Sequence, residues 1–219
     1  MVFPRIGVPL SVKAMRYAHI AYETRLTFMS IRDEIRYRQQ EGRLHLLRLR
    51  APRSSIKRPL FVTSPLWGRL NGPWSSKEET ERWNSLWADL ERFVEGRLID
   101  PNYLIWLAPR QDLLFEIRSV QPRPSLRVFC RFAEPDILIA TNYAERTWLE
   151  GRGSPQWRIA INEAKAIWRQ LFPSYDPCPG SSIRDFITEN VADDAPFSRG
   201  GSRRPRPVLS SSKAKKPSL

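Results

Sequence analysis

Arginines on one side of short predicted strands are the residues of this sequence best suited to chemistry. Three β-type segments follow one another closely, at 113–120, 126–132 and 136–142. Residues two apart on a strand point to the same side, so Arg127 and Arg131 share one side of the second strand, and Arg118 has the same place on the first. Guanidinium groups fit phosphate oxygens. This face therefore predicts a site for a phosphate backbone, unless these arginines are simply the solvated side of a half-buried sheet.

Most other catalytic patterns are missing from the middle of the chain. His19 and His45 both fall in the N-terminal region, which argues against histidine triads or histidine metal sites in a central domain. There is no GxxxxGK[ST] or GxGxxG loop, and the spacing of Cys130 and Cys178 suggests neither a disulfide nor a metal site. We expect no metal and no cofactor.

Arginine and tyrosine remain as candidates for RNA cleavage. Such a nuclease must align a ribose 2′-hydroxyl with the neighbouring phosphate and stabilise the extra negative charge of the transition state, which clustered arginines can do. Arginine is rarely neutral, so proton transfer would fall to Tyr143 or to an arginine with a perturbed pKa.

The charge distribution divides the chain into three parts. Residues 1–58 hold 13 Lys/Arg against 4 Asp/Glu, residues 59–172 hold 15 against 14, and residues 173–219 hold 8 against 5. The excess base is therefore at the ends. We expect a basic N-terminal extension, in which Met29 is an alternative start, then an α+β domain at 59–172, and a Pro/Ser/Arg-rich tail that is mostly disordered.

The central domain is expected to contain one antiparallel sheet of about four strands. A strand is predicted at 59–64, before a Gly/Pro loop at 65–74. Amphipathic helices are predicted at Ser76–Glu95, which opens with a capping-box pattern, and at Pro155–Leu171. Both helices are expected on the apolar face of the sheet, which leaves the arginine face open.

The sequence also bears on location. It has no run of 18 apolar residues and no leader with a basic start and an apolar middle. We expect a cytoplasmic protein with no membrane partner.

The segments LFEIRSV, LRVFCRF and DILIATNYAERTW, in the order strand, helix, three-stranded meander, helix, resemble the RelE/ParE superfamily of bacterial toxins, particularly its HigB-like or phage-related branch. The resemblance covers about residues 59–172. It implies a small α+β fold and a type II toxin that cleaves mRNA on the ribosome without metal. The implied partners are the mRNA, the ribosome and a cognate antitoxin, expected to be a helix-turn-helix protein.

The resemblance also implies roles for individual residues. Arg127 and Arg146 would be catalytic together with Tyr143, and the scissile phosphate would be bound by three further arginines, Arg118, Arg123 and Arg131. As an exposed residue, Arg127 could be replaced at little cost in stability. The chain departs from the family pattern because its strands carry no lysine and both ends are extended. The alternative is a non-catalytic protein-binding member, either a gyrase-type inhibitor or a degenerate orphan.

Overall fold

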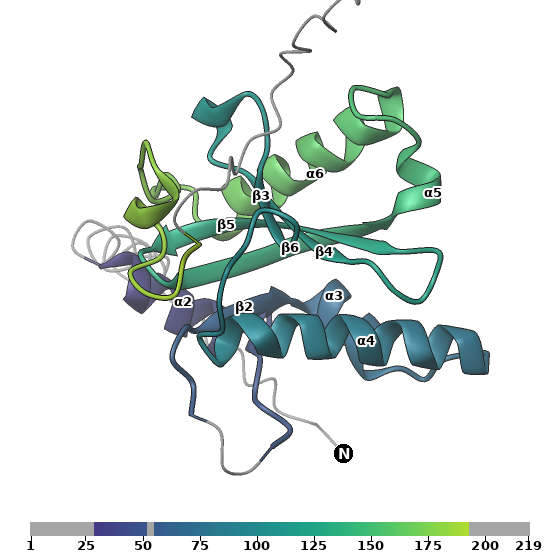
Figure 1. Cartoon of the computed structure of the whole chain (residues 1–219). Helices are drawn as coiled ribbons and strands as arrows, with labels where there is room; N and C mark the ends of the chain where they lie inside the picture. Colours follow the sequence, from purple (N-terminus) through teal and green to yellow (C-terminus); the bar gives the residue numbers. More distant parts are fainter. Residues whose placement is uncertain (1–28, 52–54, 193–219) are drawn as a thin grey trace, which may run out of the picture.

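A six-stranded mixed sheet forms the centre of the computed structural model, which describes residues 29–51 and 55–192 (Figure 1). The strand order is β1-β2-β6-β5-β4-β3. The strands are β1 Leu44–Leu46, β2 Leu60–Thr63, β3 Leu104–Trp106, β4 Phe115–Ser119, β5 Leu126–Glu134 and β6 Ile137–Glu145. The helices are α2 Ile31–Gln40, α3 Ser64–Asn71, α4 Lys77–Val94, α5 Arg146–Leu149 and α6 Pro155–Leu171, with 3-10 turns at Arg110–Asp112 and Ile183–Asp185.

The predicted meander is confirmed as β4, β5 and β6, which pair antiparallel in sequence order. The expectation of about four antiparallel strands is corrected in two ways. β1 and β3 add short edge strands, which have three residues each and are too brief to show an alternating pattern. β2 runs parallel to β6, because α3 and α4 carry the chain across one face before the meander begins, so the sheet is mixed.

The two long helices form where their periodicity predicts. The Ser76 side chain caps α4 by accepting from the Glu79 amide, and Ser154 caps α6, where Pro155 occupies a first-turn position that needs no amide hydrogen. The loop expected at 65–74 is wrong over most of its length, because it forms α3. Pro65 is tolerated in the first turn of α3, where no amide hydrogen is needed. Gly72, with φ +74, ends the helix.

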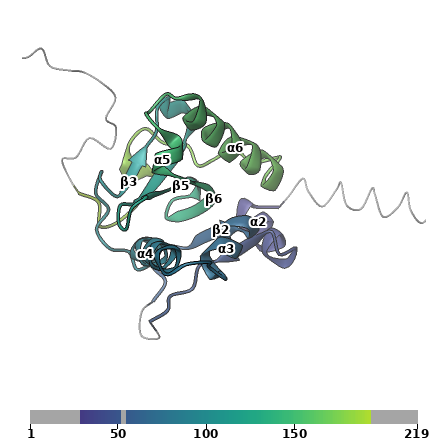
Figure 2. The same cartoon turned by 90° about the vertical axis from the view of Figure 1, so that its right-hand side faces the viewer.

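Helices cover both faces of the sheet, contrary to the expectation that α4 and α6 share one face. Figure 2 shows α3 and α4 on one side of the strands and α6 on the other. On the α4 side, Phe132 of β5 packs 6.2 Å from Phe93. On the α6 side, Phe129 of the same strand packs edge-on to Trp157 at 5.8 Å. β5 is therefore buried on both faces, and the arginine side of the meander is not an open surface.

The folded unit extends beyond the expected limits of 59–172 at both ends. β1 pairs with β2, and Ile35 of α2 packs with Trp168 and Leu171 of α6. At the other end, Phe186 is fully buried among Trp106, Phe115 and Phe132, at ring distances of 5.0–5.4 Å. Residues 29–58 and 173–192 therefore include parts of the core. The expectations for residues 1–28 and for the tail beyond 192 lie outside the described residues.

The buried side chain of Arg58 links the C-terminal segment 173–192 to the sheet. Arg58 donates to the carbonyls of Arg97 and Glu189 and forms an ion pair with Asp136, Nε to Oδ1 3.7 Å. Burial lowers the pKa of Arg58, while the Asp136 carboxylate opposes that shift. One side chain thus joins the α4–β3 connection, the β5–β6 turn and the segment after the last 3-10 turn.

We expect Phe186→Ala to reduce the free energy of unfolding by about 3–5 kcal/mol, because it opens a cavity among three aromatic rings. Urea denaturation followed by tryptophan fluorescence measures the change. Leu98→Ala is the control, since Leu98 is 53% exposed and should change stability by less than about 0.5 kcal/mol. Equal effects of the two substitutions would show that the C-terminal segment does not belong to the core.

Candidate functional site

One buried carboxylate gathers several of the predicted arginines. Glu116 on β4 is 0% exposed. Its Oε1 lies 2.7 Å from Nε of Arg127 and accepts a hydrogen bond from Nε of Arg118 at 3.0 Å. These arginines are directly opposite one another in the β4–β5 register, and Arg152, in the loop before α6, places Nη2 3.9 Å from the other carboxylate oxygen.

Arg146 completes this group of charges. It begins α5, and its amide donates to the Ser125 carbonyl at 2.8 Å, which holds it beside the start of β5. Burial is the main cause that lowers the pKa of Arg127, Glu116 opposes the shift, and the positive charges of Arg118, Arg146 and Arg152 add to it. No carboxylate among the described residues forms an ion pair with Arg146.

We call Glu116, Arg118, Arg127, Arg146 and Arg152 the Glu116 cluster. Three guanidinium groups lie 2.7–3.9 Å from one carboxylate, and the charge of Arg146 acts on Arg127, so the arginines outnumber the carboxylate in this cluster. Arg127 is 9% exposed, whereas Arg118 and Arg146 are half-buried and Arg152 is exposed. The buried Glu116–Arg127 pair is thus the base of a cationic site whose three outer arginines reach the surface, an arrangement suited to an oxyanion such as phosphate.

The expectation that Arg127 and Arg131 are exposed is wrong. Arg131 is 7% exposed and sits 5.8 Å from the ring of Trp168, under α6. Its Nη2 donates to the Asp112 carbonyl at 2.7 Å, and burial lowers its pKa. The physical reason is the second helical layer, since Phe129 between the two arginines makes this face apolar enough to bind α6. Arg131 therefore has a structural place outside the cluster.

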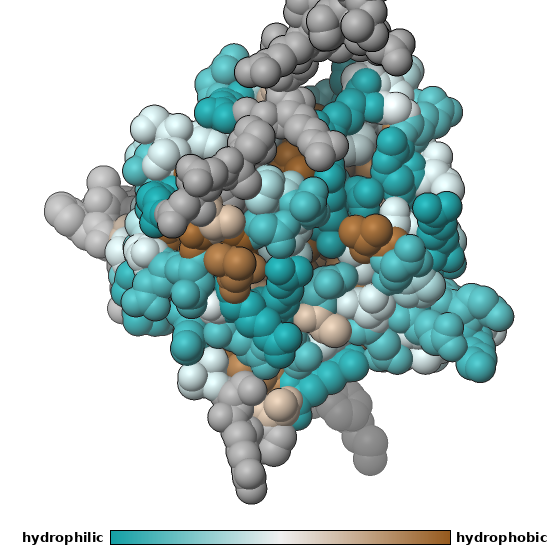
Figure 3. Space-filling view, in the orientation of Figure 1, coloured by the Kyte–Doolittle hydropathy of each residue, from teal (hydrophilic) through white to brown (hydrophobic). Residues whose placement is uncertain are grey.

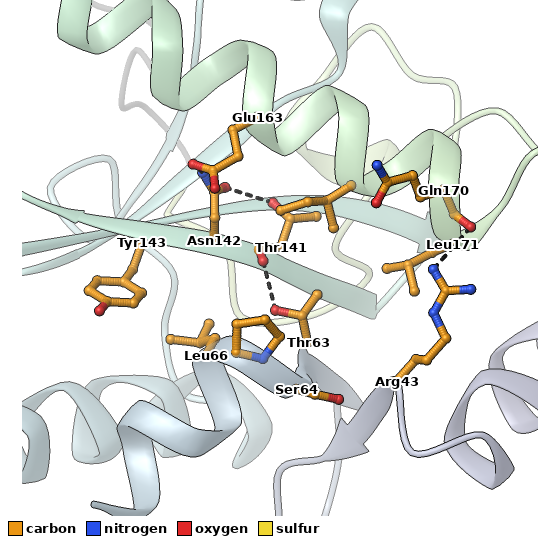
Figure 4. Close-up of a pocket in the computed structure, with 12 residues that line it drawn as sticks. Arg43, Thr63, Ser64, Leu66, Thr141, Asn142, Tyr143, Glu163, Gln170 and Leu171 are labelled. Atoms are coloured by element: carbon orange, nitrogen blue, oxygen red, sulfur yellow. Dashed lines mark hydrogen bonds between the residues drawn. The ribbon is translucent and has the colours of Figure 1, made fainter.

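The other predicted site residues also lie apart from the cluster. Arg123 is exposed in the β4–β5 loop, and no contact joins it to Glu116 in the part of the chain that the structure describes. Tyr143 packs edge-on to Trp83 of α4, with ring centroids 4.8 Å apart. In Figure 4 the Tyr143 ring points away from α6, while the neighbouring Asn142 points toward it. Tyr143 and Arg127 thus lie on opposite faces of the sheet.

Sequence reasoning missed two members of the cluster. The missed residues are Glu116 and Arg152. Glu116 lies two positions before Arg118 on one strand, so its place on the arginine face was visible in the pattern. Arg152 lies in the segment LEGRGSP, which has no periodicity. Only the path of the chain from α5 to α6 brings it back to Glu116.

Apart from the Glu116 cluster, a hollow of about 480 Å³ lies between the start of α3, β6 and α6 (Figure 4). Its polar side chains are largely bound to one another. Thr63 Oγ1 donates to the Thr141 carbonyl at 2.7 Å, Asn142 Nδ2 donates to Glu163 Oε2 at 2.9 Å, and Arg43 donates to the Gln170 carbonyl at 3.3 Å. The walls therefore offer few unused groups for a ligand.

Beside this hollow, His45 pairs with Ser64, although sequence reasoning placed His45 in the N-terminal extension, outside the domain. His45 lies on β1, within the sheet, and its Nε2 is 3.1 Å from Ser64 Oγ. The Ser64 hydroxyl donates to the Gly42 carbonyl, so it accepts from the imidazole. A serine nucleophile needs the opposite polarity, with histidine accepting the hydroxyl proton. The pair therefore fits a structural role.

Comparisons with known proteins gave no match, whether against protein-family models, curated proteins or solved structures. Within residues 29–51 and 55–192, no three His, Cys, Asp or Glu side chains come together as metal ligands. Among these residues, none of the helices combines the length and the apolar character of a membrane span. The face of the molecule in Figure 3 is mostly hydrophilic, with smaller, separate hydrophobic patches.

Replacing Arg127 with alanine removes the closest cation from a fully buried carboxylate. We expect the free energy of unfolding to fall by about 3–5 kcal/mol, because breaking a buried pair leaves the other charge uncompensated. Chemical denaturation at neutral pH measures this loss. Arg123→Ala removes the same charge from an exposed loop and should cost less than about 0.5 kcal/mol. If both variants unfold at the same denaturant concentration, Glu116 and Arg127 do not stabilise the sheet as a pair.

Proposed function

We propose that this chain is a RelE/ParE-like toxin whose Glu116 cluster binds the phosphate backbone of RNA. The observation that carries the proposal is that Arg118, Arg127 and Arg152 gather around one buried carboxylate. The charge of Arg146 acts on Arg127, and Arg146 forms no ion pair with any carboxylate among the described residues. Like-charged guanidinium groups repel one another, so a bound phosphate would relieve this repulsion as well as accept hydrogen bonds.

The order of the elements supports the family part of the proposal. A strand (β2), helices (α3 and α4), the meander β4–β6 and a final helix (α6) follow one another along the chain, which is the order on which the resemblance rests. β3 adds one short strand before the meander. The resemblance then supplies the specific partners we propose, namely mRNA on the ribosome and a helix-turn-helix antitoxin.

Within the proposed site, the exposed and the buried residues have different roles. Arg118, Arg146 and Arg152 reach solvent and would contact phosphate oxygens. Glu116 is buried and would hold Arg118 and Arg152 in place, because both contact its carboxylate. The backbone of Arg146 is held separately, by its hydrogen bond to the Ser125 carbonyl. In a cleavage reaction such fixed donors would stabilise the charge that develops on the phosphorus oxygens.

A second candidate function is a non-catalytic protein-binding member of the same superfamily. The position of Tyr143 favours it, since this tyrosine packs against Trp83 on the face opposite the cluster and cannot transfer a proton at a phosphate bound there. A toxin that only binds its target needs no proton donor. The two functions differ in whether RNA is cut, which expression experiments can decide.

A triple variant in which glutamine replaces Arg118, Arg146 and Arg152 should bind single-stranded RNA with an affinity that depends less steeply on salt concentration. Each lost phosphate contact removes about 0.7 from the slope of log affinity against log salt, so three contacts correspond to a change of about 2. Fluorescence anisotropy with a labelled oligonucleotide between 50 and 200 mM salt, on the order of the range where such contacts matter, gives both slopes.

The matched control replaces Arg36, Arg48 and Arg97, which are exposed and lie elsewhere on the surface. It removes the same net charge. The control should leave the slope closer to that of the unaltered protein than the cluster variant does. Equal changes in the two triple variants would mean that RNA responds to overall charge, and the cluster would not be the binding site.

Cleavage is tested by induced expression followed by mapping of RNA ends. The unaltered protein should arrest growth and produce new mRNA ends, and the variant without Arg118, Arg146 and Arg152 should produce neither at equal protein level. If the unaltered protein arrests growth and leaves mRNA intact, the non-catalytic candidate replaces the ribonuclease. If it does neither, the toxin proposal is wrong.

A further inference from the structure

A cleft of about 520 Å³ adjoins the Glu116 cluster, between the first half of α6 and the segment 107–112. Leu107, Trp157 and Ile161 supply its apolar lining. Leu107 and Trp157 are buried in the core between the sheet and α6, and Ile161 packs against the same group. These side chains are held by the core, so the floor of the cleft is fixed before any ligand arrives.

The rim of this cleft is cationic. Arg158 lines it and is exposed, and no carboxylate among the described residues pairs with it. Lys165, on the same side of α6, forms an ion pair with Asp112 across the cleft, Nζ to Oδ2 2.5 Å. Asn162 lies between them in sequence and is also exposed. Its amide can both donate and accept hydrogen bonds, and no contact within the described ranges uses it.

Arg152 joins the cleft to the cluster. Its guanidinium carbon lies 6.0 Å from the centroid of the Trp157 ring, while its Nη2 lies 3.9 Å from Glu116 Oε2. Arg152 therefore lines the apolar hollow and belongs to the cationic site at the same time. One ligand could therefore place an anionic part at the Glu116 cluster and a flat, weakly polar part in the cleft, because Arg152 borders both.

We propose that this cleft binds a nucleobase of single-stranded RNA whose phosphate is bound at the Glu116 cluster. The inference rests on the proposed RNA-binding function and adds a base subsite to it. A volume of about 520 Å³ is within the range of small-molecule sites. A base has an apolar face for Leu107, Trp157 and Ile161, and polar edges that the Asn162 amide can contact. Unstacked bases in single strands are free to enter such a site.

The site explains why a paired strand would bind less well. A base held in a duplex keeps both faces stacked on its neighbours and its edge engaged, so it cannot enter a cleft between a helix and a loop. The phosphate contacts alone would not make this distinction, since they are present in both forms. The cleft therefore gives the cationic site a preference for single-stranded RNA.

The test compares two short single-stranded RNA oligonucleotides, one ordinary and one with an abasic residue at each internal position. Both carry the same phosphates, so the abasic oligonucleotide reports on the cluster alone. The unaltered full-length protein should bind the ordinary oligonucleotide about tenfold more tightly, as expected for one base in contact with a fitted surface. Anisotropy titration at one fixed salt concentration measures both affinities.

Asn162→Trp places a large side chain at a position that lines the cleft. It should reduce the preference for the ordinary oligonucleotide to near unity and leave abasic binding unchanged. Ile159→Trp is the matched control, because Ile159 lies on the same helix, is 56% exposed and does not line the cleft. This control should keep the preference. Thermal unfolding of both variants, which carry exposed substitutions, verifies that each is folded.

The outcomes separate the inference from the function on which it rests. If the unaltered protein binds both oligonucleotides equally, or if Asn162→Trp keeps the tenfold preference, the base subsite is wrong while phosphate binding stands. If the unaltered protein binds neither oligonucleotide, the proposed RNA-binding function fails and the base subsite fails with it. A preference that Asn162→Trp abolishes and Ile159→Trp preserves supports the base subsite.

Discussion

The ion pair between Glu116 and Arg127 is the constraint on which the α6 side of the sheet depends. A guanidinium group in a position 9% exposed loses most of its hydration, and the effective cost of burying one ion is several kcal/mol. Glu116 offsets this cost at 2.7 Å, which allows α6 to cover a strand that carries charge. The same carboxylate then orients Arg118 and Arg152. One interaction thus permits the second helical layer and positions the groups proposed to contact RNA.

How far the sequence predicts this fold depends on the kind of signal. The long helices and the meander follow from periodicity, because the apolar residues of α4 and α6 repeat with the helical period over several turns. β1 and β3 have three residues each, so no period can be recognised. α3 was hidden by Pro65 and Gly72, residues that mark loops in isolation but here mark the ends of a helix.

The candidate site was predictable in part, because alternation along a strand indicates which residues share a face. Arg118, Arg127 and Arg146 come together as their strand positions suggest. The strand pattern could not reveal burial, since alternation of charged and apolar residues looks the same whether the charged face meets water or is covered by a helix. Arg131 was misplaced for this reason, whereas Tyr143 lies on the opposite face because it pairs with Val128 rather than with Arg127. The contribution of Arg152 depends on a loop, whose path no local pattern encodes.

The parallel pairing of β2 with β6 has a consequence for the order of events during synthesis. Leu60 faces Leu138 and Val62 faces Ala140, so β2 leaves the ribosome long before its neighbour exists. Until residue 140 has been made, the backbone groups of β2 on its β6 side remain unpaired, and Phe61 still lacks the α6 residues that cover it in the folded protein. Closing so long a loop is entropically costly, and contacts of this separation slow folding. The nascent chain must therefore remain soluble with its sheet half assembled, and the surplus of basic residues before β2 provides charge repulsion between such chains during that interval.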